Sequence, residues 1–172
     1  MDAAVGREPG VAGEHHRTDG ATTVHVDAPA VGVASVGSIP PPMASAAWVG
    51  ATARVELTVT DADTAQALGS GDVPVLGTPR LLALAEAATV AATTARVPAG
   101  ATTVGTRVEL THHAATPVGR TVVAEARLAT AQGRRLEFDI TVRDGTEVVA
   151  EGRVERVLVD RHRFVTKAFG GR

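Results

Sequence analysis

A histidine is expected to face the interior of the fold. His112 lies in Val104–Thr116, a stretch in which apolar and polar residues alternate as in a half-buried strand. Val104, Val108, Leu110 and His112 share the apolar phase, and successive strand side chains point to opposite faces. An inward imidazole loses hydration unless it is hydrogen-bonded. His112 is therefore a candidate site residue that could transfer a proton or orient water.

A carboxyl group that could act with His112 lies upstream, in Thr78–Val97. This run is rich in good helix formers, with Thr78 as a predicted N-cap and Pro79 at the first helical position. Glu86 is the only charged residue in its middle part, and a helix that is apolar nearly all round is typically buried. We therefore expect Glu86 in or beside the core, where burial raises the pKa of a carboxyl group unless hydrogen bonds or a cation hold it ionised.

A third polar group follows in the last predicted strand, Glu147–Val159. Arg156 shares the phase of the apolar residues of this strand, which are Val148, Ala150, Val154 and Leu158. A guanidinium on an apolar face needs a carboxylate, a phosphate or a carbonyl group as partner. His113 has the opposite phase to His112 and is expected in solvent, which argues against a metal site made of both. No metal site is predicted.

Composition limits the classes of protein. The chain has 172 residues, 44% of them hydrophobic, which is enough for one domain with a core. It has no cysteine, which excludes disulfides and thiolate chemistry and is consistent with a cytoplasmic protein. A net charge of −2 gives no drive toward nucleic acid, and no apolar run is long enough for a membrane span.

Residues 1–47 differ from the rest of the chain and are expected to form a disordered tail. They are rich in Gly, Ala, Pro and Val and contain no aromatic residue. Val31–Val36 is the one alternative, a short strand weakened by its glycine. Residues 1–42 are expected to be dispensable, with Met43 as a candidate start. The domain is predicted at 48–165, and 166–172 is expected to be a C-terminal tail.

The order of elements predicts an α+β fold. A strand at Arg54–Thr60 precedes the long helix, and four consecutive strands follow it, starting at Val104, Arg120, Arg135 and Glu147. A five-stranded antiparallel sheet wrapped around one apolar helix is the hotdog architecture. Such a sheet leaves an edge to protect, and pairing two copies edge to edge would cover it. We therefore expect a homodimer.

Four stretches carry a family resemblance: GTPRLLALAEAA, VGTRVELTHHAATPVG, GRRLEFDITVRDG and EGRVERVLVDRHRF. They resemble the fluoroacetyl-CoA thioesterase family and the broader hotdog acyl-CoA thioesterases, over about Arg54–Phe164. The resemblance implies an active site of Thr78, Glu86 and His112. It also implies that Gly105 and Arg156 bind the substrate. The implied reaction is hydrolysis of a small acyl-CoA without a cofactor, since coenzyme A is part of the substrate.

One departure from the family concerns selectivity. The fluoroacetate-specific enzyme carries a lid phenylalanine shortly before its threonine, where this chain has Asp72, and Gly69–Gly77 holds no aromatic residue. A preference for a fluorinated acyl group is therefore not expected. Two other functions remain open: a hotdog dehydratase or hydratase acting on acyl thioesters, and a non-catalytic acyl-CoA-binding protein in which Glu86 and His112 only pair with each other.

Overall fold

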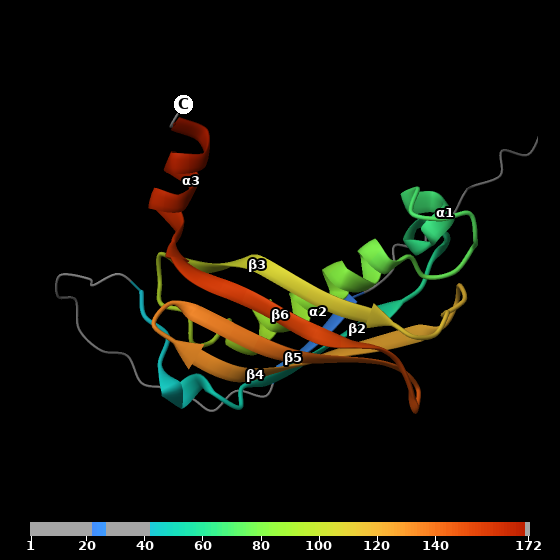
Figure 1. Cartoon of the computed structure of the whole chain (residues 1–172), viewed down its shortest axis with the longest axis horizontal. Coiled ribbons are helices and arrows are strands. Elements are labelled where there is room, and N and C mark those ends of the chain that lie inside the picture. The colour runs from blue at the N-terminus through green and yellow to red at the C-terminus, as the bar shows by residue number, and fades with distance from the viewer. Residues whose placement is uncertain (1–21, 27–41, 171–172) are drawn as a thin grey trace, which may run out of the picture.

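One antiparallel sheet forms the body of the molecule (Figure 1). The computed structural model describes residues 22–26 and 42–170. Six strands follow the order β1-β2-β4-β5-β6-β3. They are β1 (Thr22–Val26), β2 (Thr52–Thr58), β3 (Ala101–His112), β4 (Thr121–Gln132), β5 (Arg135–Asp144) and β6 (Glu147–Asp160). The two edges of the sheet are therefore β1 and β3.

The helices lie on one face of this sheet and at its two ends (Figure 1). The long helix α2 (Thr78–Thr93) packs along the inner face, and the short α1 (Ala65–Leu68) lies beside its N-terminal end. The helix α3 (Arg161–Gly170) extends from the other end of the sheet. Two 3₁₀ turns, η1 (Ala46–Trp48) and η2 (Asp61–Asp63), flank β2. This α+β arrangement is the predicted hotdog architecture.

Hydrophobic side chains, nearly all of them aliphatic, fill the space between α2 and the sheet. The predicted inward residues of β2, β4 and β5 are buried, and Phe138 is the one aromatic residue among the buried hydrophobic residues of the described chain. The inward set is Val55, Leu57, Val59, Val122, Ala124, Ala126, Leu128, Leu136, Phe138, Ile140 and Val142. These side chains and the buried face of α2 form one hydrophobic core.

The prediction for the long helix needs three corrections. The helix ends at Thr93 rather than Val97, and Gly77 rather than Thr78 is its N-cap. The helix is also not buried all round. Ala83, Ala87 and Val90 form an exposed apolar stripe along one side.

The structure differs from the predicted tails at both ends of the domain. Thr22–Val26 forms β1 and pairs with β2, although no secondary structure was expected there; four of its five residues are β-branched, which favours a strand. Val31–Val36 lies outside the described residues. At the other end, 161–170 is helical, because Asp160 Oδ1 accepts a hydrogen bond from the Arg163 backbone N–H at 2.8 Å.

A β-bulge divides β3 into two halves of opposite phase. Gly105 pairs with Arg156 and Arg107 with Glu155, so Thr106 is an extra residue. Residues 103 and 105 therefore face the helix before the bulge, and 108, 110 and 112 face it afterwards. The inward prediction for Val104 was wrong for this reason, while that for His112 is confirmed.

None of the helices in the described part of the chain is both long and apolar enough to cross a membrane.

Candidate active site

The first cluster of the site joins the start of α2 to the end of β3. The Thr78 hydroxyl lies 3.0 Å from Nδ1 of His112. Thr78 is the first residue of the helix, and its backbone N–H donates no hydrogen bond within the described residues. Because Pro79 has no N–H, the N–H of Thr78 is the donor left free in the first turn. Thr78 therefore offers a hydroxyl and a backbone donor beside one imidazole.

A buried carboxylate holds the start of α2 in place. Asp63 Oδ2 accepts hydrogen bonds from the backbone N–H and the hydroxyl of Thr60 at 2.8 and 2.6 Å. Its Oδ1 accepts from Arg80 Nε at 2.7 Å, and its backbone oxygen accepts from the Gly77 N–H at 2.9 Å. Although burial raises the pKa of Asp63, the hydrogen bonds from Thr60 and Arg80 outweigh it and lower the pKa overall. The ionised Asp63 thus fixes the residues on both sides of Thr78.

The environment of His112 lowers its pKa, which favours the neutral imidazole. Burial lowers the pKa of His112 most, and the neighbouring His113 lowers it further. A hydrogen bond with the backbone of Ala114 raises the pKa in part. Its second ring nitrogen, Nε2, is buried and has no partner within the described chain. A buried polar atom without a partner is uncommon unless the site serves a function. Nε2 is therefore an unsatisfied hydrogen-bonding atom of the site, although the described residues keep it out of solvent.

The second cluster lies further along α2. Arg156 Nη1 is 3.3 Å from Glu86 Oε1, and its Nε and Nη2 donate to the hydroxyl and carbonyl oxygens of Thr103 at 2.9 and 3.0 Å. The Arg156 side chain is 7% exposed and that of Glu86 is 36% exposed. Burial lowers the pKa of Arg156, whereas the charge and the hydrogen bond of Glu86 raise it in part. The guanidinium of Arg156 holds the Glu86 carboxylate at the edge of the core through Oε1 and makes no hydrogen bond to Oε2.

Gly105 completes this cluster. It lies in β3 directly opposite Arg156, and a Cβ at this position would clash with Oε1 of Glu86. The absence of a side chain therefore lets the carboxylate rest against the strand. Thr103 was not identified from the sequence, because the bulge hid its inward phase.

The predicted site residues are thus brought together in two pairs. Thr78 contacts His112 and Glu86 contacts Arg156, but no hydrogen bond or ion pair joins the pairs within the described residues. Since the helix is regular from Thr78, Glu86 lies ~12 Å further along its axis. The predicted N-cap role of Thr78 is wrong, because the helix already includes Thr78.

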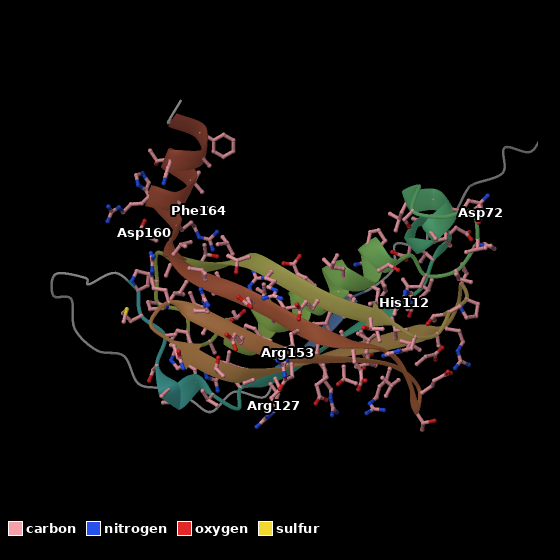
Figure 2. The ribbon with its side chains drawn as sticks, viewed as in Figure 1. Asp72, His112, Arg127, Arg153, Asp160 and Phe164 are labelled. Atoms are coloured by element: carbon pink, nitrogen blue, oxygen red, sulfur yellow. The ribbon has the colours of Figure 1, made fainter. Side chains whose placement is uncertain are left out.

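A cavity of ≈ 300 Å³ opens beside the first pair. Its walls include Thr78 and His112, together with Val73, Val75 and Leu76 from the loop before α2. Figure 2 shows His112 at this end of the sheet, with Asp72 farther out on the loop. The loop side of the lining is mostly apolar, with Ser70 as its polar residue, and Thr78 and His112 form the polar side, which suits a small acyl group.

No metal centre accompanies these residues. Within 22–26 and 42–170, no group of three or more His, Cys, Asp or Glu side chains could hold a metal ion.

The fold and the site define a class, the hotdog thioesterases. Residues 59–162 match the family described as fluoroacetyl-CoA-specific thioesterase. The fluoroacetyl-CoA thioesterase of Streptantibioticus cattleyicolor is 34% identical over 93 residues, which cover 54% of this chain and 67% of that protein. The chain belongs to the fluoroacetyl-CoA-specific thioesterase family. The predicted family and the predicted enzyme class, thioester hydrolase, are confirmed.

Solved structures agree with this assignment. A structure of the fluoroacetyl-CoA thioesterase FlK superposes with a TM-score of 0.67 at 29% identity, covering 72% of this chain and 96% of that one. A hot-dog-like protein from Thermanaerovibrio acidaminovorans gives 0.64 at 26% identity, covering 72% and 94%. A thioesterase superfamily member from Thermus thermophilus gives 0.65 at 25% identity, covering 70% and 89%. The predicted hotdog fold is confirmed.

Proposed function

We propose that this protein hydrolyses small acyl-CoA thioesters with Thr78, Glu86 and His112. The observation that carries the proposal is the Thr78–His112 pair, which lines a small cavity and includes a backbone N–H and an imidazole nitrogen that have no partner among the described residues. A variant of the related thioesterase FlK has been solved in complex with acetyl-CoA, which supports the substrate class. The reaction needs no cofactor, because the thioester is itself reactive.

The start of α2 would polarise the thioester carbonyl. The Thr78 N–H can donate to the oxygen that becomes negative, and the positive end of the helix dipole adds to this stabilisation. When Nε2 of His112 is unprotonated, it can take a proton from water and then return it to the sulfur. The water oxygen attacks the carbonyl carbon, the C–S bond breaks, and the thiolate of coenzyme A takes up a proton.

Glu86 would supply the base or the nucleophile. As a base it removes a proton from the attacking water; as a nucleophile it forms a mixed anhydride that water then opens. Arg156 holds the carboxylate in either case, and Gly105 leaves room for it. A thioester carbon within hydrogen-bond reach of Thr78 is out of reach of Glu86 of the same chain, since ~12 Å of helix separates them.

A homodimer would resolve this separation. β3 is an edge strand, and two copies could pair through it in antiparallel register. A two-fold axis passing α2 near Leu82, midway between 78 and 86, would place Thr78 of one subunit opposite Glu86 of the partner subunit. The exposed stripe of Ala83, Ala87 and Val90 supports such contact. Each of the two sites would then combine residues of both chains.

The test is the release of free coenzyme A thiol from a panel of short acyl-CoAs. We expect turnover of acetyl-CoA or a close homologue, and a loss of about a hundredfold or more in Glu86→Gln, as for general acid–base groups. A wild-type protein that binds the panel without releasing thiol would favour a non-catalytic binding protein. Hydration of an enoyl-CoA, with the thioester left intact, would favour a dehydratase or hydratase.

We propose a cytoplasmic location, consistent with the absence of cysteine and with the substrate, which is made and used inside cells.

A further inference from the structure

A second cavity lies where α3 joins β6. Figure 2 shows Asp160 and Phe164, which line it, at the end of the sheet opposite His112. Its volume is ≈ 710 Å³, larger than that of the cavity beside Thr78. The start of β3, the end of β6, the β4–β5 turn and one side of α3 form its walls. None of the residues identified above as the candidate active site lines it.

The lining combines positive charge with apolar surface. Arg134, Arg163 and Lys167 contribute three cations, and the structure gives their side chains no ion pair or hydrogen bond within the described residues. Asp160 is the one carboxylate of the lining, and one of its oxygens caps α3. Phe164 is 45% exposed and adds an aromatic face. Unpaired cations beside an exposed ring can bind phosphates and stack a base at the same time.

We propose that this cavity binds the nucleotide end of coenzyme A, a 3′-phosphorylated adenosine diphosphate. Arg134, Arg163 and Lys167 contact its phosphates, and the adenine packs on Phe164. The proposal rests on the proposed function, because it gives the same acyl-CoA substrate a second point of attachment. It assigns a role to the basic residues of α3, which the catalytic mechanism does not use.

The spacing along β3 and β6 fits one substrate bound at both places. Gly105 pairs with Arg156 beside Glu86, and Ala101 pairs with Asp160 at the cavity. Four strand residues correspond to ~13 Å. The pantetheine arm separates the thioester sulfur from the diphosphate, and in its extended form it covers this distance. A thioester beside Glu86 could therefore have its nucleotide in this cavity.

Binding of free 3′-phospho-ADP, measured by calorimetry, tests the proposal without catalysis. We expect the wild type to bind it and the double variant Arg163→Ala/Lys167→Ala to bind at least about tenfold more weakly, because two charge-assisted contacts are lost. Phe164→Ala should also weaken binding. None of the three residues is buried, so folding should not depend on them. Arg127→Ala, which removes an exposed cation of β4 far from α3 (Figure 2), is the control and should bind as the wild type does.

Kinetics separate the nucleotide from the rest of the substrate. The double variant should raise KM for acetyl-CoA about tenfold and leave kcat unchanged, and it should leave KM for acetyl-pantetheine, which lacks the nucleotide, unchanged. Equal effects on both substrates, or no binding of 3′-phospho-ADP by the wild type, would overturn the proposal. If the double variant still bound 3′-phospho-ADP but lost activity on an acyl group carried by acyl carrier protein, the proposal would be overturned, and the surface would be assigned to a protein partner. If 3′-phospho-ADP binds and no thioester is hydrolysed, the nucleotide site stands and the proposed function fails.

Discussion

Gly105 and Glu86 are in direct contact across the helix–sheet interface, so closely that a methyl group on Gly105 would overlap Oε1 of the carboxylate. We therefore expect Gly105→Ala to push the carboxylate away from its position beside Arg156. The displaced group is the far end of a flexible side chain, so the melting temperature should change little. The value of kcat should fall at least about tenfold, since a small misplacement of a reacting group is costly. Thr111→Ala, at an exposed position of the same strand, is the control. Unchanged turnover in Gly105→Ala would show that the carboxylate has no part in the chemistry.

The proposed two-chain site can be tested by mixing inactive variants. Glu86→Gln and His112→Ala should each be inactive alone. If a site combines Thr78 and His112 of one chain with Glu86 of its partner, a heterodimer has one intact site. Subunits exchanged at equal concentration should then recover about a quarter of the wild-type rate, because half of the dimers are mixed and half of their sites are intact. Light scattering checks the dimer. A mixture that stays inactive although its subunits exchange would place each site within a single chain.

The lowered pKa of His112 predicts a dependence of stability on pH. The folded chain releases this proton at a lower pH than the unfolded chain, so the unfolded chain binds more protons between the two pKa values. The free energy of unfolding should therefore fall as the pH is lowered below about 6.5, the ordinary histidine value. Urea titrations of the wild type and His112→Asn measure this, and the variant should have the shallower slope. His162→Ala, which removes an exposed imidazole of α3, should keep the wild-type slope. Equal slopes for all three would contradict the prediction.

The hydrogen bonds of Asp63 predict that the start of α2 depends on one carboxylate. Asp63→Ala leaves Arg80 and Thr60 without their partner and should lower the free energy of unfolding by about 2–4 kcal/mol. Chemical denaturation measures this loss. Asp61→Ala, an exposed acid on the same 3₁₀ turn, should stay within about 0.5 kcal/mol of the wild type. Because the pKa of Asp63 is lowered, its contribution is present above about pH 4 and is lost as the pH falls through the folded value.

The loop before α2 predicts weak selectivity for fluorine. Asp72 is exposed there, and the loop side of the small cavity is formed by aliphatic side chains and Ser70 rather than by an aromatic ring. The specificity constants for fluoroacetyl-CoA and acetyl-CoA should therefore differ by no more than roughly tenfold, the range expected for small changes in an apolar pocket. A much larger preference for the fluorinated substrate would mean that another element replaces the lid.

Periodicity predicted the elements whose phase is constant and failed where the phase changes. β2, β4 and β5 alternate without interruption over their buried parts, and their inward residues were predicted correctly. The same reasoning placed Arg156 and His112 inward. It misplaced Val104 and missed Thr103, because the extra residue of a bulge leaves no mark in an alternating pattern.

Contacts between distant segments account for the other differences. Gly77 became the N-cap because the backbone of Asp63 holds it, which no local signal at Thr78 reveals. The resemblance named Thr78, Glu86 and His112 together, but eight residues of regular helix keep 78 and 86 too far apart to touch. The site residues form two separate pairs because β3 places His112 beside the first turn of α2 and Gly105 beside Glu86, two turns later.

The bulge also makes the site sensitive to the insertion or deletion of a single residue in β3. It lies between the part of β3 that meets Glu86 and the part that ends at His112. A change of one residue there would leave Gly105 where it is and turn every later side chain of β3 to the opposite face, carrying His112 away from Thr78. Thr106 could be replaced by many other residues, but the insertion or deletion of a residue at this point would disrupt the site. Among relatives, insertions and deletions at this point should therefore be rarer than substitutions.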